Sequence, residues 1–104
     1  MQSVREVMFK LPKKFQPEAA EGMEVVFQFV IDDEAHYCLT IEDQQCQVEE
    51  REHDDPNVTL LMDGETFVDI ISGELGGTSA YMSGRLRAEG NVMLATQLSK
   101  LFKR

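Results

Sequence analysis

Apolar residues near the start of the chain recur at the spacing of a helix. Four of them follow Ser3 on one stripe: Val4, Val7, Met8 and Leu11. Ser3 suits the N-cap position, so the pattern predicts an amphipathic helix over 3–11. Pro12 is expected to end this helix, because the residue before a proline avoids helical geometry.

From Met23 the period becomes two, which predicts strands. The first run is expected to turn one face toward the core, and that face carries Val25, Phe27, Phe29 and Ile31. Residues 35–42 and 46–50 alternate in the same way, with polar turns between the runs. The three runs predict an antiparallel meander, and the charges in 46–50 are typical of an edge strand.

Two cysteines, Cys38 and Cys46, lie on the two arms of the second hairpin. A turn near 43–45 sets Cys46 opposite about Glu42 and Cys38 opposite about Glu50. The thiols are then not opposed, which disfavours a disulfide. The histidines, His36 and His53, stand at no ligand spacing from the cysteines, so no zinc site is expected.

Residues 55–90 change period three times within a short length. Val58, Leu60 and Met62 predict a strand, and Leu61 makes its second face partly apolar, as in an interior strand. Asp63 is placed to cap a following helix, and Gly73 to end it.

The remaining elements are short. Thr78 is expected to cap a helical turn over 80–82, after which residues 85–89 form a further strand. Asn91 caps the last helix, whose stripe is Leu94, Leu98 and Leu101. Elements this short cannot bury an apolar side alone, so they must share one core. A length of 104 residues fits one domain, and we expect a single α+β domain over 1–104.

Charge is strongly acidic and unevenly placed. The net charge is −9, which makes nucleic acid an unsuitable partner. Residues 16–96 hold 18 of the 19 acids, whereas 1–15 and 97–104 are both net basic. The basic ends are either solvated helix ends or a surface that contacts anionic membrane.

Catalytic and membrane-spanning patterns are missing from the sequence. It contains neither a nucleophile elbow nor a phosphate-binding loop. No window reaches the roughly 18 apolar residues of a membrane span, and the start lacks a signal-peptide pattern, so a cytoplasmic protein is expected. A small lipid-directed enzyme would have to use Ser83, Tyr81, His36 or His53, and this is the least favoured hypothesis.

Methionine is plentiful on the predicted elements. Besides the first residue, the chain contains Met8, Met23, Met62, Met82 and Met93. Methionine adapts to irregular apolar shapes, so these residues suit either an ordinary core or a pocket for a flexible apolar ligand. Periodicity alone favours the ordinary core.

The order of motifs in residues 55–102 resembles the sterol carrier protein type 2 family. The most specific part is Met-Ser-Gly-Arg-Leu-x-x-Glu-Gly over 82–90. It is preceded by Asp55-Pro56-x-Val58-x-Leu60 and a helix ending in Ile70-Ile71-Ser72-Gly73, and it is followed by Leu98-x-x-Leu101-Phe102. Residues 23–50 are compatible with the family's strand meander.

This resemblance implies a five-stranded, mostly antiparallel mixed sheet, with helices on one face enclosing an apolar cavity. It also implies non-enzymatic binding or transfer of a fatty acid, fatty acyl chain, sterol or isoprenoid, with no cofactor, no metal and no catalytic residue. The residues expected to line the cavity are Phe27, Phe29, Phe67, Ile70, Ile71, Tyr81, Met82, Leu94, Leu98, Leu101 and Phe102.

The chain departs from familiar eukaryotic members at its C-terminus. It ends Leu-Phe-Lys-Arg and not in the peroxisomal address Ser-Lys-Leu, so a peroxisomal sterol shuttle is not expected. Because many members are fused to an enzyme, a chain this compact is expected to be a stand-alone microbial member. The alternative hypothesis is an accessory interaction domain whose pocket is vestigial. Such a domain would dock onto an enzyme of lipid metabolism through its acidic middle segment.

Overall fold

A five-stranded sheet forms one layer of the protein. The computed structural model describes residues 3–32 and 34–103. The strand order across the sheet is β3-β2-β1-β4-β5. Only the central pair, β1 with β4, is parallel, and the other pairs are antiparallel, so the expected mixed sheet is confirmed. The strands are β1 Val25–Ile31, β2 His36–Glu42, β3 Gln45–Glu49, β4 Val58–Met62 and β5 Arg87–Gly90.

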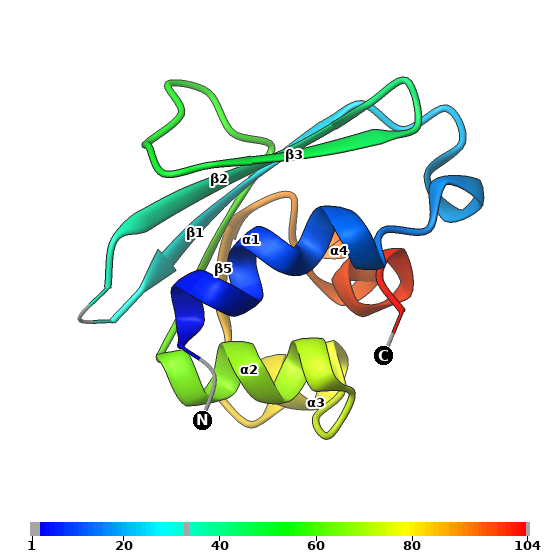
Figure 1. Cartoon of the computed structure of the whole chain (residues 1–104). Helices are drawn as coiled ribbons and strands as arrows, with labels where there is room; N and C mark the ends of the chain where they lie inside the picture. Colours follow the sequence, from blue (N-terminus) through cyan, green and yellow to red (C-terminus); the bar gives the residue numbers. More distant parts are fainter. Residues whose placement is uncertain (1–2, 33, 104) are drawn as a thin grey trace.

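The helices form the second layer, and they lie on one side of this sheet (Figure 1). They bury their apolar sides together with the facing side of the sheet in one continuous core. Their bounds are α1 Val4–Lys14, α2 Gly64–Ser72, α3 Gly77–Met82 and α4 Val92–Gln97, with 3₁₀ turns η1 Pro17–Ala20 and η2 Leu98–Leu101.

Strand register separates the two faces of the sheet. Phe27 is level with Leu39 on β2 and with Val58 on β4, and all three are fully buried under the helices. Gln28 points to the outer face, where its side chain bonds Tyr37 O, Arg51 O and the backbone N–H of His53. These bonds fix the loop of residues 51–53 over the outer face.

Three predicted helix caps are confirmed. Ser3 accepts a hydrogen bond from Glu6 N at 3.1 Å, Asp63 from Thr66 N at 2.7 Å and Asn91 from Met93 N at 3.2 Å. Gly73 ends α2 with φ +85°, as its predicted place just after the helix requires.

Two predicted helix boundaries are wrong. Helix α1 continues through Pro12 to Lys14. The apolar stripe on either side of Pro12, Leu11 and Phe15, is buried, and this packing outweighs one missing backbone hydrogen bond. Helix α3 begins at Gly77 after Gly76 as N-cap, so Thr78 lies inside the helix and does not cap it.

The C-terminal third is also less regular than its pattern predicts. Strand β5 starts at Arg87, because Arg85 is held by Thr66 and Asp69 of α2, at 3.2 and 3.1 Å, before the strand begins. The last helix is regular only to Gln97, after which the chain tightens into η2.

The second hairpin turns over two residues. Asp43 and Gln44 have φ of +51° and +57°, a geometry that matches the twist of antiparallel strands. Cys46 therefore lies opposite Ile41 and Cys38 opposite Glu49, one residue from the predicted partners. Both thiols are free, as expected.

No helix in the described parts of the chain is long and apolar enough to cross a bilayer.

Replacing Gly90 by alanine tests the junction of β5 with β4. Gly90 has φ +97°, and an added Cβ would lie 2.7 Å from Asn57 O. We expect Gly90→Ala to lower the free energy of unfolding by at least about 2 kcal/mol, from strain and overlap together. Gly84→Ala is the matched control, since Gly84 has φ +84° with open space around it. It should cost only about 1 kcal/mol. Equal costs in urea unfolding would refute the role of the close approach.

Candidate functional site

An apolar layer between helices and sheet contains most of the predicted lining residues. Nine of them are at most 9% exposed in this layer: Phe27, Phe29, Phe67, Ile70, Ile71, Leu94, Leu98, Leu101 and Phe102. They come from β1, α2 and the C-terminal α4–η2 segment, which are distant in sequence. The fold thus assembles them in one continuous cluster.

Tyr81 and Met82 do not join this cluster. Tyr81 is 41% exposed and Met82 is 79% exposed. Helix α3 is six residues long and turns Ala80 into the core, so the two residues that follow Ala80 face away from it. The structure thus places these two predicted lining residues at the surface, outside the buried cluster.

Aromatic side chains form the centre of the layer. The rings of Phe27 and Phe29 stack with centroids 6.4 Å apart, and Phe29 meets Phe67 of α2 edge to face at 5.6 Å. These contacts join the sheet to α2 and define the floor of the layer.

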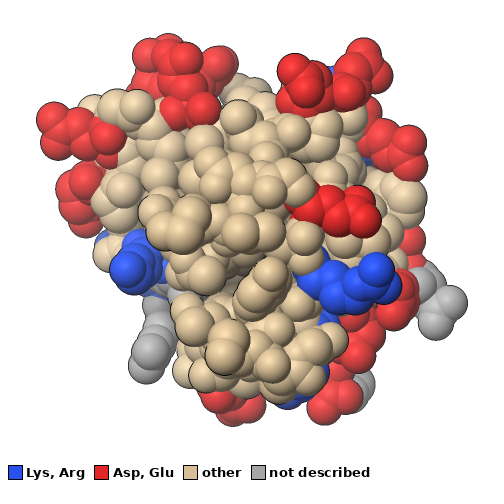
Figure 2. Space-filling model, turned by 180° about the vertical axis from the view of Figure 1, so that it is seen from behind, with Lys and Arg blue, Asp and Glu red and all other residues tan. Residues whose placement is uncertain are grey.

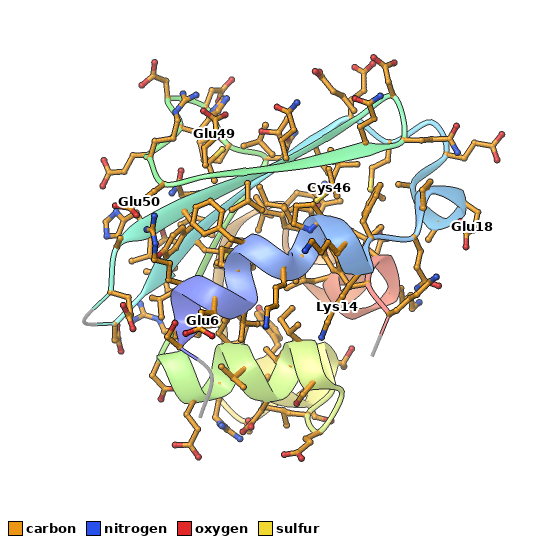
Figure 3. All side chains as sticks on the ribbon, viewed as in Figure 1. Glu6, Lys14, Glu18, Cys46, Glu49 and Glu50 are labelled. Carbon is orange, nitrogen blue, oxygen red and sulfur yellow. The ribbon has the colours of Figure 1, made fainter. Side chains whose placement is uncertain are left out.

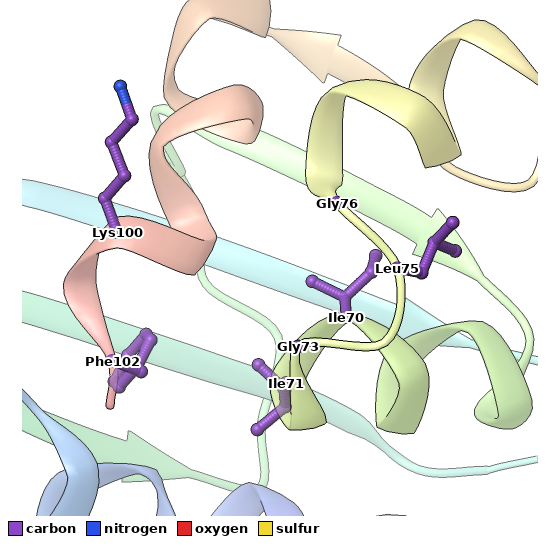
Figure 4. Close-up of a pocket in the computed structure, with 7 residues that line it drawn as sticks. All are labelled: Ile70, Ile71, Gly73, Leu75, Gly76, Lys100 and Phe102. Atoms are coloured by element: carbon purple, nitrogen blue, oxygen red, sulfur yellow. The ribbon is translucent and has the colours of Figure 1, made fainter. Parts of the chain in front are cut away.

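A hollow of about 200 Å³ opens between the end of α2 and the C-terminal segment (Figure 4). Three predicted residues, Ile70, Ile71 and Phe102, line it. Sequence reasoning missed the others, which are Gly73, Leu75, Gly76 and Lys100. Leu75 is an apolar residue inside a glycine-rich loop, and this position could have marked it as a lining residue.

A larger hollow of about 670 Å³ lies near the N-terminal ends of α1 and α2. Its lining includes three carboxylates, from Glu34, Glu65 and Asp69. An apolar ligand would leave these charges poorly solvated, which is costly. We therefore take the smaller hollow, which borders the apolar layer, as the candidate mouth.

Hydrogen bonds around Gln16 hold one wall of this mouth. Gln16 N donates to Leu101 O at 2.8 Å, and Gln16 Nε2 donates to Lys100 O at 3.1 Å. Lys103 N donates to Lys14 O at 2.8 Å alongside them. The basic end of α1 and the basic C-terminal segment are therefore neighbours, and in Figure 3 Lys14 extends from α1 toward α2.

Polar groups within the layer are already satisfied. Thr66 is fully buried, and its hydroxyl accepts a hydrogen bond from Arg85. No buried side-chain nitrogen or oxygen in the described chain lacks a partner. The interior thus offers nothing to orient a polar ligand and suits an apolar one.

The four residues of the enzyme hypothesis are divided between the two sides of the sheet. Tyr81 and Ser83 belong to the α3 turn in the helical layer, where the Ser83 hydroxyl donates to Ala80 O at 3.2 Å. His36 bonds Glu52 at 2.6 Å, and His53 accepts a hydrogen bond from Asp55 N. Both histidines lie at the outer face, so these four residues supply no nucleophile paired with a base.

Burial holds one cysteine thiol in its protonated form. Burial raises the pKa of the Cys46 thiol to about 12, which keeps it protonated at neutral pH. Within residues 3–32 and 34–103, no group of three or more His, Cys, Asp or Glu side chains is placed to hold a metal ion.

Comparison with known families decides the identity of this fold. The SCP-2 sterol transfer family matches residues 7–103.

This chain belongs to the SCP-2 sterol transfer family.

Proteins similar to this SCP-2 chain include much larger ones, of which it matches only a part. Hydroxysteroid dehydrogenase-like protein 2 of Rattus norvegicus is 33% identical over 92% of the chain, which spans 19% of the rat protein. The sec-alkylsulfatase Pisa1 of Pseudomonas sp. contains a similar fold, which covers 93% of this chain and 16% of the Pisa1 chain. The TM-score is 0.84 and the sequence identity is 16%.

A solved structure of similar length shares the fold over nearly its whole extent. Palmitated SCP2L2 of Aedes aegypti superposes with a TM-score of 0.78 at 21% identity. The match covers 99% of this SCP-2 chain and 96% of the mosquito chain.

Substituting Asp63 tests how α2 is positioned over the sheet. Hydrogen bonds from Thr66, with a smaller effect of Arg85, lower the pKa of Asp63. We expect Asp63→Ala to cost about 1 kcal/mol in urea unfolding near pH 7, and Asp63→Asn much less, because asparagine also caps helices.

The charge on Asp63 gives this contribution its pH dependence. Because the folded pKa is depressed, the stabilisation is complete above the unfolded value of about 4 and is lost as pH falls through the folded value. Asp63→Asn should therefore lose less stability than the parent over the acid range. Parallel acid profiles for the two proteins would contradict this assignment.

Proposed function

We propose that this chain binds a lipid non-covalently, with the lipid chain in the apolar layer between the sheet and the helices, and transfers it without chemical change. The observation that carries this proposal is the mouth at Ile71, Leu75 and Phe102, which borders a largely apolar layer. Membership of the SCP-2 sterol transfer family supports it.

Burial of apolar surface supplies the affinity in such a site. Each Å² of apolar ligand surface removed from water contributes about 25 cal/mol. Since the polar groups of the layer bond one another, no buried donor or acceptor is left to oppose the ligand.

Uptake of the ligand requires the layer to widen. Pockets for small organic ligands usually measure about 300–1,000 Å³, and the mouth measures about 200 Å³. The C-terminal segment is tethered to residues 14–16 by three hydrogen bonds, two donated by Gln16 and one donated by Lys103. We infer that this segment moves outward as the lipid enters.

An acyl chain with an anionic end fits the mouth best among the expected lipids. Lys100 lines the mouth. Lys14 and Lys103 lie beside it, joined by a backbone hydrogen bond from Lys103 N to Lys14 O. No described lysine takes part in an ion pair with a carboxylate. The palmitated form of the mosquito protein, which shares this fold, supports a fatty acyl ligand.

Native mass spectrometry of the protein purified from cells tests the proposal. We expect an adduct with the mass of a fatty acid or fatty acyl lipid, which is lost on denaturation. A protein that is always empty, and that gains no thermal stability from fatty acids, acyl-CoA, sterols or isoprenoids, would refute it.

Blocking the mouth should separate ligand uptake from folding. Leu75 is half-buried at the mouth, so Leu75→Trp adds volume there without a new core cavity. We expect it to weaken fatty-acid binding by about tenfold or more, because an overfilled mouth resists entry of the lipid chain. Displacement of a fluorescent fatty acid measures this affinity. Leu75→Ala, the matched control, should bind as well as the parent. Equal affinity of both variants, with unchanged melting temperatures, would rule out this mouth.

We also propose that the basic ends of the chain contact an anionic membrane from the expected cytoplasmic location. Lysines near an anionic surface contribute about 1 kcal/mol each. Lys100→Gln with Lys103→Gln should therefore weaken co-sedimentation with anionic vesicles by about tenfold at low salt. Binding unaffected by salt and by both substitutions would exclude a contribution of these two lysines. Arg104, the third basic residue of the C-terminus, lies outside the described residues.

A second candidate function is an accessory domain for a lipid-metabolism enzyme. Relatives that carry this region as a small part of an enzyme favour it. The contact would use the acidic residues between 16 and 96, so a pull-down should lose the partner as salt rises. Failure to recover any salt-sensitive partner would remove this candidate.

A further inference from the structure

Large apolar side chains are exposed mainly on α3 and α4. In the described parts of the chain, the large hydrophobic residues that remain exposed are Phe9, Tyr81, Met82, Val92 and Met93. All but Phe9 lie on these two helices, which pack against each other. We call the surface formed by Tyr81, Met82, Val92 and Met93 the α3–α4 face.

Charged residues avoid the segments that form this face. Residues 75–84 and 90–99 contain none, although 28% of the chain is charged. The rear view of the molecule has a broad centre without charged side chains, and acidic groups lie mainly toward its rim (Figure 2). Such a surface loses little when water is removed from it, because no ion has to be desolvated.

The sign of the flanking charge indicates what covers the face. From residue 75 onward the chain has one acid, Glu89, against five basic residues, whereas residues 1–74 hold 18 acids. An anionic surface would attract this third of the molecule, together with the net basic residues 1–15. It would repel residues 16–74, which hold 17 acids against one basic residue, Arg51. The charges therefore orient the α3–α4 face toward such a surface.

The face also borders the proposed mouth. Gly76 lines the mouth and is the N-cap of α3, while Lys100 and Phe102 line it from the segment that follows α4. A lipid leaving through the mouth would emerge beside the exposed methionines.

We propose that the α3–α4 face docks this protein onto an anionic lipid bilayer, with Met82 and Met93 entering the boundary between headgroups and acyl chains. Methionine suits this role because its unbranched side chain adapts to a disordered apolar medium. The basic residues supply attraction at a distance, and the methionines supply the apolar contact that charge alone lacks.

Vesicle flotation with lipid-free protein tests the docking. Met82→Ser combined with Met93→Ser should lower partition onto phosphatidylcholine–phosphatidylglycerol vesicles by about tenfold or more, since two apolar side chains no longer enter the bilayer. Both residues are exposed, at 79% and 66%, so the melting temperature should stay unchanged. Phe9→Ser is the matched control, because Phe9 is 40% exposed on α1. It should partition within about twofold of the parent.

Other outcomes would overturn the proposal. Equal partition of the methionine variant and the parent would show that the face does not enter the bilayer. Equal loss in the Phe9 control would show a general effect of exposed apolar residues. A dimer of the parent that becomes a monomer in the methionine variant, measured by light scattering, would assign the face to a second copy of this chain.

The result is independent of the proposed lipid cargo. The flotation uses no ligand, and fatty-acid binding by the methionine variant should equal that of the parent. Loss of vesicle partition with retained fatty-acid binding supports the docking face. Retained vesicle partition despite both serines refutes the face alone and leaves the proposed lipid binding intact.

Discussion

The packing of the helices against the inner side of β1 is the contact on which the rest of this protein depends. Phe27 and Phe29 point into the helical layer, and no part of their surface is exposed. Parallel pairing with β4 requires a crossover, and that crossover is the long chain segment carrying β2 and β3. Helix α2 then starts directly after β4, which sets Phe67 against Phe29. The helical layer follows from this placement.

Local sequence signals predicted the elements better than their ends. The caps at Ser3, Asp63 and Asn91 were predictable because each forms within one turn of chain. The ends at Pro12 and Arg85 were not, because distant partners decide them. Packing of Leu11 and Phe15 carries α1 past its proline, and bonds from Arg85 to α2 delay β5. These contacts leave no local pattern.

The candidate site shows the same division. Burial of Phe67, Ile70 and Leu98 follows from their place on apolar stripes. Periodicity could not tell that Tyr81 and Met82 face outward, because a helix of six residues has no repeat from which to read a face. The position of Lys100 depends on a hydrogen bond from the Gln16 side chain to Lys100 O, which no short motif encodes. Exposure of the methionines, which periodicity assigned to a core or pocket, is what suggests a membrane-facing role.

The pairing of residues 14–16 with 101–103 has a consequence for folding kinetics. It closes a loop that contains nearly the whole chain, so forming it before the sheet exists would cost loop entropy that these few contacts do not offset. It should form last, and at equilibrium it should be among the first contacts to open. Release of the C-terminal segment and widening of the mouth are then the same local unfolding event. The rate at which cargo exchanges would be set by the chain's own final folding step.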